Sequence, residues 1–240
     1  MSILINGRLD PLSVSTPGIG VLARRVPANK GGLMPMVSRQ EFKRLPLRVH
    51  TVLAGVPLHD AWAIDLAHWR PGIALCQFLK VSPLLGMGSS PSVRTLFRLR
   101  RRIGKTFGWD RRSDLASTPT FVSQVPPDVC DQSVIEPGTP EGDFRVVYSL
   151  PNEHLSELRN NLVHGALSVA LIEDERFYRL YLGVFVLSVN RFTPFYMAAI
   201  APFRHWIVYP AILNTFQKNW NDCFGANEGK VSPPLTKPRL

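Results

Sequence analysis

Two apolar segments, LVHGALSVALI (162–172) and RLYLGVFVLSV (179–189), decide the fold of this 240-residue chain. Both are rich in β-branched and aromatic residues and have the length of buried strands, so they predict a β-hairpin joined by residues 173–178. Thr193 then offers a helix N-cap, and Pro194 suits the first helical position. The order predicts late strands followed directly by a helix.

The pattern after Pro194 predicts a long C-terminal helix. Apolar side chains recur at steps of three and four over about seven turns, which is typical of a stripe that faces a core. The members of this stripe are Phe195, Ala199, Pro202, Trp206, Tyr209, Leu213, Phe216 and Trp220. Because Pro202 and Pro210 lie within it, we expect a kink or a break instead of one straight helix.

Earlier segments predict further strands and a long connection. FRVVYSL (144–150) has the pattern of a strand, and VHTVLAGV (49–56) and AWAIDL (61–66) predict two short strands separated by Pro57. Residues 111–142 contain five prolines and predict a loop or crossover. Together these elements favour an α+β domain.

The excess of positive charge is concentrated in part of the chain. The net charge is +10, and residues 94–112 carry eight basic and one acidic residue. PSVRTLFRLRRRIGKTFG (91–108) predicts an amphipathic helix with basic residues largely opposite its apolar face. These basic residues are Arg94, Arg98, Arg101, Arg102 and Lys105. The basic residues dock on an anionic surface, pair with residues 113–160, which carry eight acidic and two basic residues, or form a solvated face.

No metal or cofactor is expected. Cys76, Cys130 and Cys223 are too far apart for a zinc site. GIGVLA (18–23) lies between two prolines, and GKT (104–106) lies inside a predicted helix, so neither has the context of a nucleotide-binding loop. No charge-free run exceeds 13 residues, whereas a spanning helix needs about 20. Reduced thiols and an N-terminus without the pattern of a secretory signal favour a cytoplasmic protein, peripheral to the membrane if the basic helix docks there.

A polar group, NEHLSELRNNLVH (152–164), leads into the first strand of the hairpin. If this segment is one strand, Asn160 and His164 share one face, and Glu157 and Arg159 share the other. Polar side chains on an apolar strand can orient a ligand in a pocket. The alternative is hydrogen-bonded residues at a strand start with a Glu–Arg pair on the surface.

The residues HLSELRN (154–160), LVHG (162–165) and VFVLSVNRFTPFYMAAIAPFRHWIV (184–208) resemble an uncharacterised bacterial domain family. We associate that family with the START-like, polyketide-cyclase-like superfamily, and the resemblance extends over residues 42–220. It implies a helix-grip fold, in which a curved antiparallel sheet grips a long C-terminal helix and an apolar cavity lies between them.

We therefore expect an α+β helix-grip domain over residues 42–224, with a flexible extension over 1–41 and a disordered tail over 225–240. The expected function is binding of a small apolar, lipid- or polyketide-like ligand in that cavity, and the expectation leans away from an enzyme. The residues expected to line the cavity are Trp62, Tyr148, Glu157, Asn160, His164 and Tyr196.

Two alternatives remain. The first is a peripheral protein that docks on anionic lipid through residues 91–108, with its arginines on headgroups. The second is a cyclase or isomerase, because a cavity with Glu157 and His164 nearby could move protons. Nucleic acid is not an expected partner, since no aromatic-interleaved strand or DNA-reading motif accompanies the arginines.

Overall fold

The computed structural model describes residues 36–67, 71–81, 119–160, 163–174, 177–191 and 193–225. These residues belong to one unit of the chain, residues 33–240. The predicted basic helix 91–108, most of the predicted N-terminal extension and residues 226–240 lie outside the described residues. The predicted boundary at residue 42 falls inside a helix, and the Val37 N–H already donates to the Ala61 carbonyl (3.0 Å).

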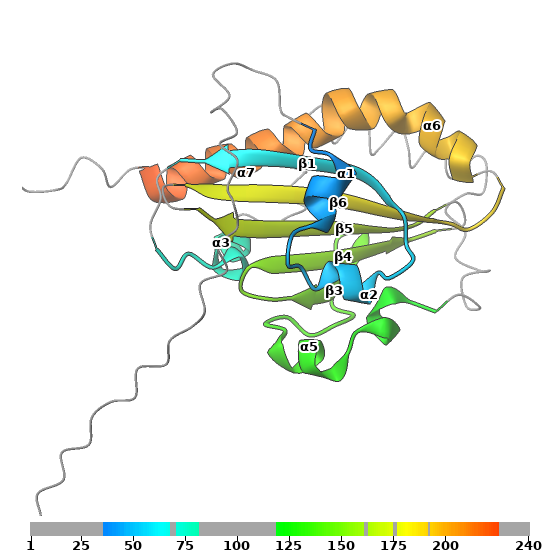
Figure 1. Ribbon diagram of the computed structural model, residues 1–240, viewed down its shortest axis with the longest axis horizontal. Helices are drawn as coiled ribbons and strands as arrows, with labels where there is room; N and C mark the ends of the chain where they lie inside the picture. The colour runs from blue at the N-terminus through cyan, green and yellow to red at the C-terminus, as the bar shows by residue number, and fades with distance from the viewer. Residues whose placement is uncertain are drawn as a thin grey trace, which may run out of the picture. The chain divides into compact units, whose positions relative to one another are not determined.

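The centre of the fold is a curved, six-stranded antiparallel sheet with the strand order β1-β6-β5-β4-β3-β2 (Figure 1). The strands are β1 (Leu58–Leu66), β2 (Pro140–Glu141), β3 (Phe144–Ser149), β4 (Glu153–Arg159), β5 (Val163–Glu173) and β6 (Tyr178–Ser188). The predicted hairpin is confirmed, because β5 pairs with β6 from Val163↔Ser188 to Glu173↔Tyr178. The first strand of the sheet pairs with the last, with Leu66 opposite Tyr178.

Helices pack on both faces of this sheet (Figure 1). Their bounds are α1 (Arg39–Lys43), α2 (Val49–Val52), α3 (Leu75–Val81), the 3-10 helix η3 (Phe121–Gln124), α5 (Pro127–Gln132), α6 (Thr193–Phe203), the π-helical segment η4 (Arg204–Val208) and α7 (Tyr209–Phe224). Elements α1, α2, η3 and α5 contribute to the core on one face. Elements α3 and α7 contribute to the core on the other face.

The burial of β5 on both faces explains why its sequence is a continuous apolar run. Ala166 and Ala170 belong to the core on the α2 side, whereas Leu167, Val169 and Leu171 belong to the core on the α7 side. A strand that is buried on both faces has no need for alternating polar residues. The fold class is therefore α+β, as predicted, with an arrangement of sheet and C-terminal helix that is compatible with a helix grip.

The C-terminal helix is continuous over 32 residues but irregular between its two prolines. Pro202 lies in the last turn of α6, Pro210 lies in the first turn of α7, and the π-helical segment η4 occupies the residues between them. Proline lacks an N–H, and its ring collides with the carbonyl four residues earlier, so it disturbs regular α-helical hydrogen bonding. The widened turn of η4 accommodates this conflict.

The predicted core stripe is right for α7 and wrong for α6. Tyr209, Leu213, Phe216 and Trp220 are buried, but Phe195 and Trp206 are 77% and 81% exposed. The stripe members Ala199 and Pro202 are also exposed. A π turn holds an extra residue and so rotates the preceding helix by about 100° relative to a continuous α-helical pattern. The buried residues of α6 are Thr193 and Met197, each two residues away from the nearest predicted position.

The segment 49–56 is not a strand. Val49, Val52 and Leu53 are buried, and residues 49–52 form the helix α2. Spacings of three and four place these side chains on one helical face, which lies against the sheet. The prediction of a strand failed because β-branched residues are compatible with a short helix when a tertiary contact holds its end.

Candidate functional site

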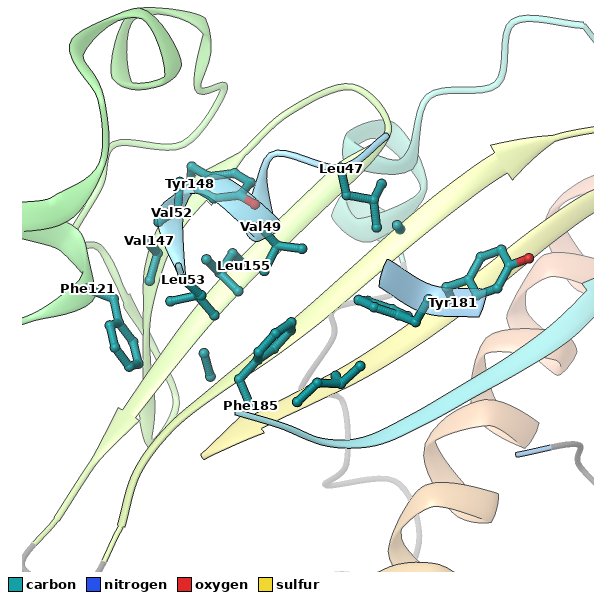
Figure 2. Close-up of a cluster of buried hydrophobic side chains, with 14 of the residues drawn as sticks. Leu47, Val49, Val52, Leu53, Phe121, Val147, Tyr148, Leu155, Tyr181 and Phe185 are labelled. Atoms are coloured by element: carbon teal, nitrogen blue, oxygen red, sulfur yellow. The ribbon is translucent and has the colours of Figure 1, made fainter. Parts of the chain in front are cut away.

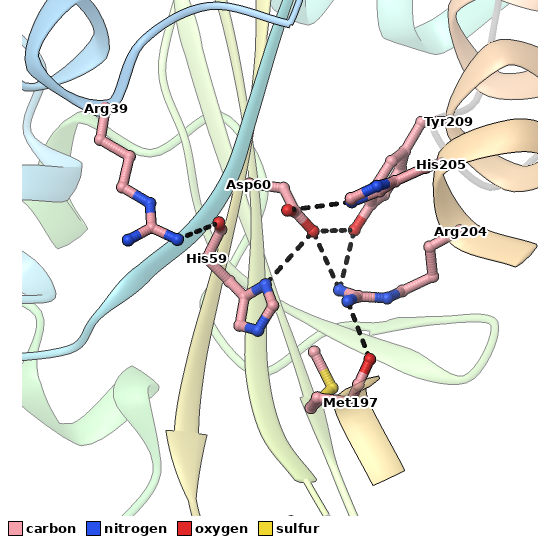
Figure 3. A network of polar contacts seen from close by, with 7 residues as sticks. All are labelled: Arg39, His59, Asp60, Met197, Arg204, His205 and Tyr209. Atoms are coloured by element: carbon pink, nitrogen blue, oxygen red, sulfur yellow. Dashed lines mark hydrogen bonds and ion pairs between the residues drawn. The ribbon is translucent and has the colours of Figure 1, made fainter. Parts of the chain in front are cut away.

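A buried polar network joins β1 to the C-terminal helices (Figure 3). The Asp60 carboxylate of β1 accepts a hydrogen bond from Arg204 Nη1 (3.0 Å) and another from the Tyr209 hydroxyl (2.9 Å), both at Oδ2. His205 Nε2 lies 3.1 Å from Asp60 Oδ1. Arg204 and His205 lie in η4, so the irregular turn of the helix places the network.

Arg204 is bound by groups from three elements. Its Nη1 also donates to the Tyr209 hydroxyl oxygen (3.2 Å), and its Nη2 donates to the Met197 carbonyl oxygen (3.2 Å). Asp60 and Arg204 are 7% and 9% exposed, respectively. Two opposite charges at this depth are favourable only when they are paired and hydrogen-bonded, as they are here.

The network determines the protonation states of Asp60 and Tyr209. Burial by itself raises the pKa of Asp60, but the contact with His59 (Nδ1 to Oδ2, 3.4 Å), the charge of Arg204 and bonds from Tyr209 and His205 outweigh burial. Together they hold the pKa of Asp60 well below its usual range. Burial and the nearby charge of Asp60 raise the pKa of Tyr209. At neutral pH the carboxyl is therefore ionised and the phenol is neutral.

Trp62 lies beside this network. Its ring centroid is 5.4 Å from that of Tyr209 and 5.8 Å from that of His205. Its indole Nε1–H is buried and has no hydrogen-bond partner among the described residues, and the same holds for Nε of Arg204. Buried N–H donors are normally paired, so these two are exceptions that need an explanation.

Apolar clusters surround the network. Trp62 and Tyr209 belong to the core that also contains Phe78, Phe216 and Trp220 farther along α7. Toward α6 lies a small cluster of three buried residues, namely Val163, Val186 and Met197, with Tyr196 packed against it. The network thus supplies the polar groups in surroundings that are otherwise apolar.

The structure does not bring the six predicted cavity residues together. Trp62 and Tyr196 lie on the side of the sheet that carries the C-terminal helices. Tyr148 lies in the core on the opposite face, with Leu155 and the residues of α2 (Figure 2). Glu157 and His164 belong to the same opposite side, because both contact Phe121 of that core. One cavity between the sheet and the C-terminal helix therefore does not include all six residues.

Tyr148 and Glu153 anchor α2. The Glu153 carboxylate accepts hydrogen bonds from the backbone N–H groups of Arg48 (2.7 Å) and Val49 (2.8 Å) at the start of this helix. The Tyr148 hydroxyl donates to Glu153 Oε1 (2.5 Å). Burial, together with the charge of Glu153, raises the pKa of Tyr148. The contact caps a helix whose own residues provide no side-chain cap.

Glu157 and His164 form a buried pair, in contrast to the prediction that they occupy opposite faces. His164 Nε2 lies 2.6 Å from Glu157 Oε1, and both side chains are 1% exposed. Phe121 donates its N–H to the same carboxylate oxygen (3.2 Å) and stacks on the His164 ring with centroids 3.9 Å apart. The prediction was wrong because Glu157 and His164 belong to two paired strands instead of one.

Asn160 shapes the turn between those strands. Its side-chain oxygen accepts the Val163 N–H (2.9 Å), and its own N–H donates to the Val163 carbonyl (2.9 Å). An asparagine that closes a turn in this way acts on the backbone. This bond assigns Asn160 to the turn that places His164 opposite Arg159.

A third buried group consists of His154, Ser156 and Glu141. The Ser156 hydroxyl donates to Glu141 Oε2 (2.7 Å) and lies 2.8 Å from His154 Nε2. Burial raises the pKa of Glu141, but the bonds from His154 and Ser156 outweigh it and lower this pKa. The same His154 nitrogen faces both Ser156 and Glu141. A serine nucleophile needs the acid on the other ring nitrogen, so the group lacks that geometry.

The polar network had a signal in the sequence. Asp60 stands at the start of the apolar run of β1, and Arg204-His205 interrupts the apolar pattern of the C-terminal helix. Opposite charges inside two buried elements are expected to pair, because an unpaired buried charge is costly. The pattern of each element alone does not show that the two positions meet.

Comparisons with known proteins identify one family. Residues 52–211 match the model of a family described as "Protein of unknown function (DUF2867)". No curated protein and no solved structure matches the chain. Among the described residues, no helix has the length and apolar character needed to cross a membrane, and no three His, Cys, Asp or Glu side chains could hold a metal ion together. With the match extending over two thirds of its length, the chain belongs to the DUF2867 family of proteins of unknown function.

Proposed function

We propose that this chain binds one small, mainly apolar molecule between the sheet and the C-terminal helices, beside Trp62 and Arg204. The observation that carries the proposal is the pair of buried donors, Trp62 Nε1–H and Arg204 Nε–H, that lack partners among the described residues. A buried polar group without a partner costs about 1–3 kcal/mol. A ligand that brings an acceptor to these donors recovers that free energy.

The surroundings favour a particular ligand class. Both unpartnered groups are donors, so the ligand supplies a carbonyl or carboxylate oxygen. The neighbouring clusters around Met197 and Phe216 are apolar, so the remainder of the ligand is hydrocarbon. Lipid-like and polyketide-like acids have this combination. Their affinity derives from apolar surface removed from water, at about 25 cal/mol per Å², while the donors set the orientation.

A specific contact also favours a second candidate, a reaction that transfers a proton. In the buried Glu157–His164 pair, Glu157 Oε2 and His164 Nδ1 have no partners among the described residues. A carboxylate–imidazole pair can serve as a general base in a cyclase or isomerase. Docking on anionic lipid through residues 91–108 stays a prediction from the sequence, because this helix lies outside the described residues.

Calorimetric titration of the full chain with dodecanoate, which combines a carboxylate with an alkyl chain, tests the binding proposal. Trp62→Phe keeps an aromatic ring and removes the N–H. We expect saturable 1:1 binding to the wild type and at least tenfold weaker binding to this variant, since a hydrogen bond to a charged group contributes about 1.5–3 kcal/mol.

Tyr148→Phe is the matched control, because it removes a buried hydroxyl on the opposite face of the sheet. It should bind dodecanoate as the wild type does. Absence of saturable binding, or equal affinity of the Trp62→Phe variant, would contradict the proposal. Mass spectrometry of an organic extract of the purified protein, compared with a mock purification, would then identify the molecule that the chain retains.

A further inference from the structure

The outer face of α6 and η4 is entirely apolar. Every residue between 193 and 208 that is exposed has a nonpolar side chain. These residues, which we call the α6 stripe, are Pro194, Phe195, Ala198, Ala199, Pro202, Phe203 and Trp206. The three aromatic members are the most prominent, with Phe195 77%, Phe203 48% and Trp206 81% exposed.

The α6 stripe ends where α7 begins. The exposed residues in the middle of α7 are polar: Asn214, Gln217, Lys218 and Asn221. A helix on the surface of a water-soluble domain normally carries such polar residues opposite its core-facing side. Helix α6 buries Met197 on one side and exposes Phe195 on the other, so both of its sides are apolar. A second apolar partner would account for the outer side.

We propose that the α6 stripe docks on the surface of a phospholipid membrane that contains anionic lipids. Tryptophan and phenylalanine are the side chains that amphipathic helices insert at the boundary between headgroups and acyl chains. Phe195, Phe203 and Trp206 follow one another at intervals of eight and three residues, so they lie along one side of the helix. The helix would lie in the plane of the membrane and insert these three rings.

Charge supports an anionic lipid surface as the partner. From residue 176 to residue 221 the chain contains no acidic residue and five basic ones, which are Arg176, Arg179, Arg191, Arg204 and Lys218. Two of them are already paired with carboxylates from earlier in the chain, Arg204 with Asp60 and Arg179 with Asp65. Arg191, two residues before α6, and Lys218, on α7, are exposed at either side of the stripe. Each basic residue near an anionic membrane contributes about 1 kcal/mol of attraction.

The size of the stripe favours a membrane over a second copy of the chain. An aromatic side chain offers about 200 Å² of surface, so the exposed parts of the three rings amount to about 400 Å². A stable dimer buries about 800 Å² per partner. Insertion into lipid requires no complementary protein surface, and a few aromatic side chains with nearby basic residues are enough for reversible binding.

The inference is independent of the proposed ligand site. The stripe residues point away from the sheet, whereas Trp62 and Tyr209 are buried between the sheet and the helices. Substitutions in the stripe therefore leave the residues of the ligand site in place. Either proposal can fail while the other holds.

Flotation of the full chain with vesicles of phosphatidylcholine containing about a third phosphatidylserine tests the inference. The decisive variant replaces three side chains: Phe195→Ser, Phe203→Ser and Trp206→Ser. We expect the wild type to float with the vesicles at low salt and less so at high salt, because headgroup attraction is screened. The triple variant should bind at least tenfold more weakly and still unfold cooperatively, because most of the substituted surface is exposed.

The matched control is Met36→Ser with Val134→Ser, which removes two exposed apolar side chains outside the stripe (63% and 50% exposed). It should float as the wild type does. A wild type that does not bind the vesicles would overturn the inference. Flotation of the triple variant equal to that of the wild type would also overturn it. In that case another surface, such as residues 91–108, would be the one that binds the membrane. A dimeric wild type that the triple variant converts to monomers would assign the stripe to a second copy of the chain.

Discussion

Arg204 of η4 and Asp60 of β1 form a buried ion pair across 144 residues of sequence, with Nη1 and Oδ2 3.0 Å apart. The arginine sits in the only π-helical segment of the described residues, directly after the proline-containing end of α6. The pair therefore ties the irregular turn of the C-terminal helix to the edge strand of the sheet. It also holds the Arg204 side chain beside Trp62, where the proposed ligand would bind.

Removal of the carboxylate should destabilise the fold strongly. Asp60→Asn leaves the guanidinium of Arg204 buried without its counter-charge, and the loss of one partner from a buried pair costs about 3–5 kcal/mol. Urea unfolding at pH 7 measures this loss. The double variant Asp60→Asn/Arg204→Met should lose less than the two single variants together, because it leaves no unpaired buried charge. Additive losses would show that the two residues do not interact.

The contribution of Asp60 should depend on pH with a defined sign. Its pKa is lower in the folded chain than the usual value of 3.8. The stabilisation is therefore complete above that usual value, decreases as the pH falls below it, and is lost once the pH falls through the folded pKa. The difference in unfolding free energy between the wild type and Asp60→Asn should therefore narrow as the pH falls from 4 toward 2. A difference that grows over that range would contradict the assignment.

Gly183 of β6 should not tolerate a side chain. A Cβ atom at this position would lie 2.5 Å from Cζ of Phe42, which belongs to α1 and is fully buried. Gly183→Ala should therefore lower the free energy of unfolding by about 1–3 kcal/mol, the usual range for overpacking. Phe42→Leu in the same chain makes room and should recover part of this loss. If the losses of the two substitutions simply add in the double variant, the contact between residue 183 and Phe42 is not the cause of the destabilisation.

Glu153, which caps α2, should contribute more to the free energy of unfolding than Tyr148, which donates a hydrogen bond to it. Glu153→Gln replaces one acceptor oxygen by a donor next to backbone N–H groups and the Tyr148 hydroxyl. A loss of about 1–3 kcal/mol follows from the unpaired groups. Tyr148→Phe removes one bond and should cost about 1 kcal/mol. Urea unfolding of both variants measures this order, and a larger loss for Tyr148→Phe would contradict it.

The sequence was sufficient for the central part of the fold. The strands 163–173 and 178–188 have apolar runs of the right length, and Pro202 and Pro210 flank the irregular π-helical segment of the C-terminal helix. These features are local, because strand length and proline chemistry depend on neighbouring residues alone. The α+β class follows from the order of these elements.

The failures concern interactions between distant residues. Helix α2 starts at Val49, where its first N–H groups are capped by Glu153, more than a hundred residues away. The exposure of Phe195 and Trp206 depends on the extra residue of η4, which shifts the buried face without any change in the apolar pattern. The pairing of Glu157 with His164 depends on a turn at Asn160 that a single-strand interpretation overlooks.

His164 provides a direct comparison of a structural role with a role in a pocket. The structure surrounds it with Glu157 and the stacked ring of Phe121. His164→Phe keeps the stacking and removes the bond to Glu157, which should cost about 1–3 kcal/mol. His164→Ala also removes an aromatic contact, which adds about 0.5–1.5 kcal/mol. In urea unfolding, the wild type should therefore have the largest free energy of unfolding, His164→Phe an intermediate one and His164→Ala the smallest. A His164→Phe variant that is as stable as the wild type would show that the pair does not stabilise the fold, and that result would favour the proton-transfer candidate.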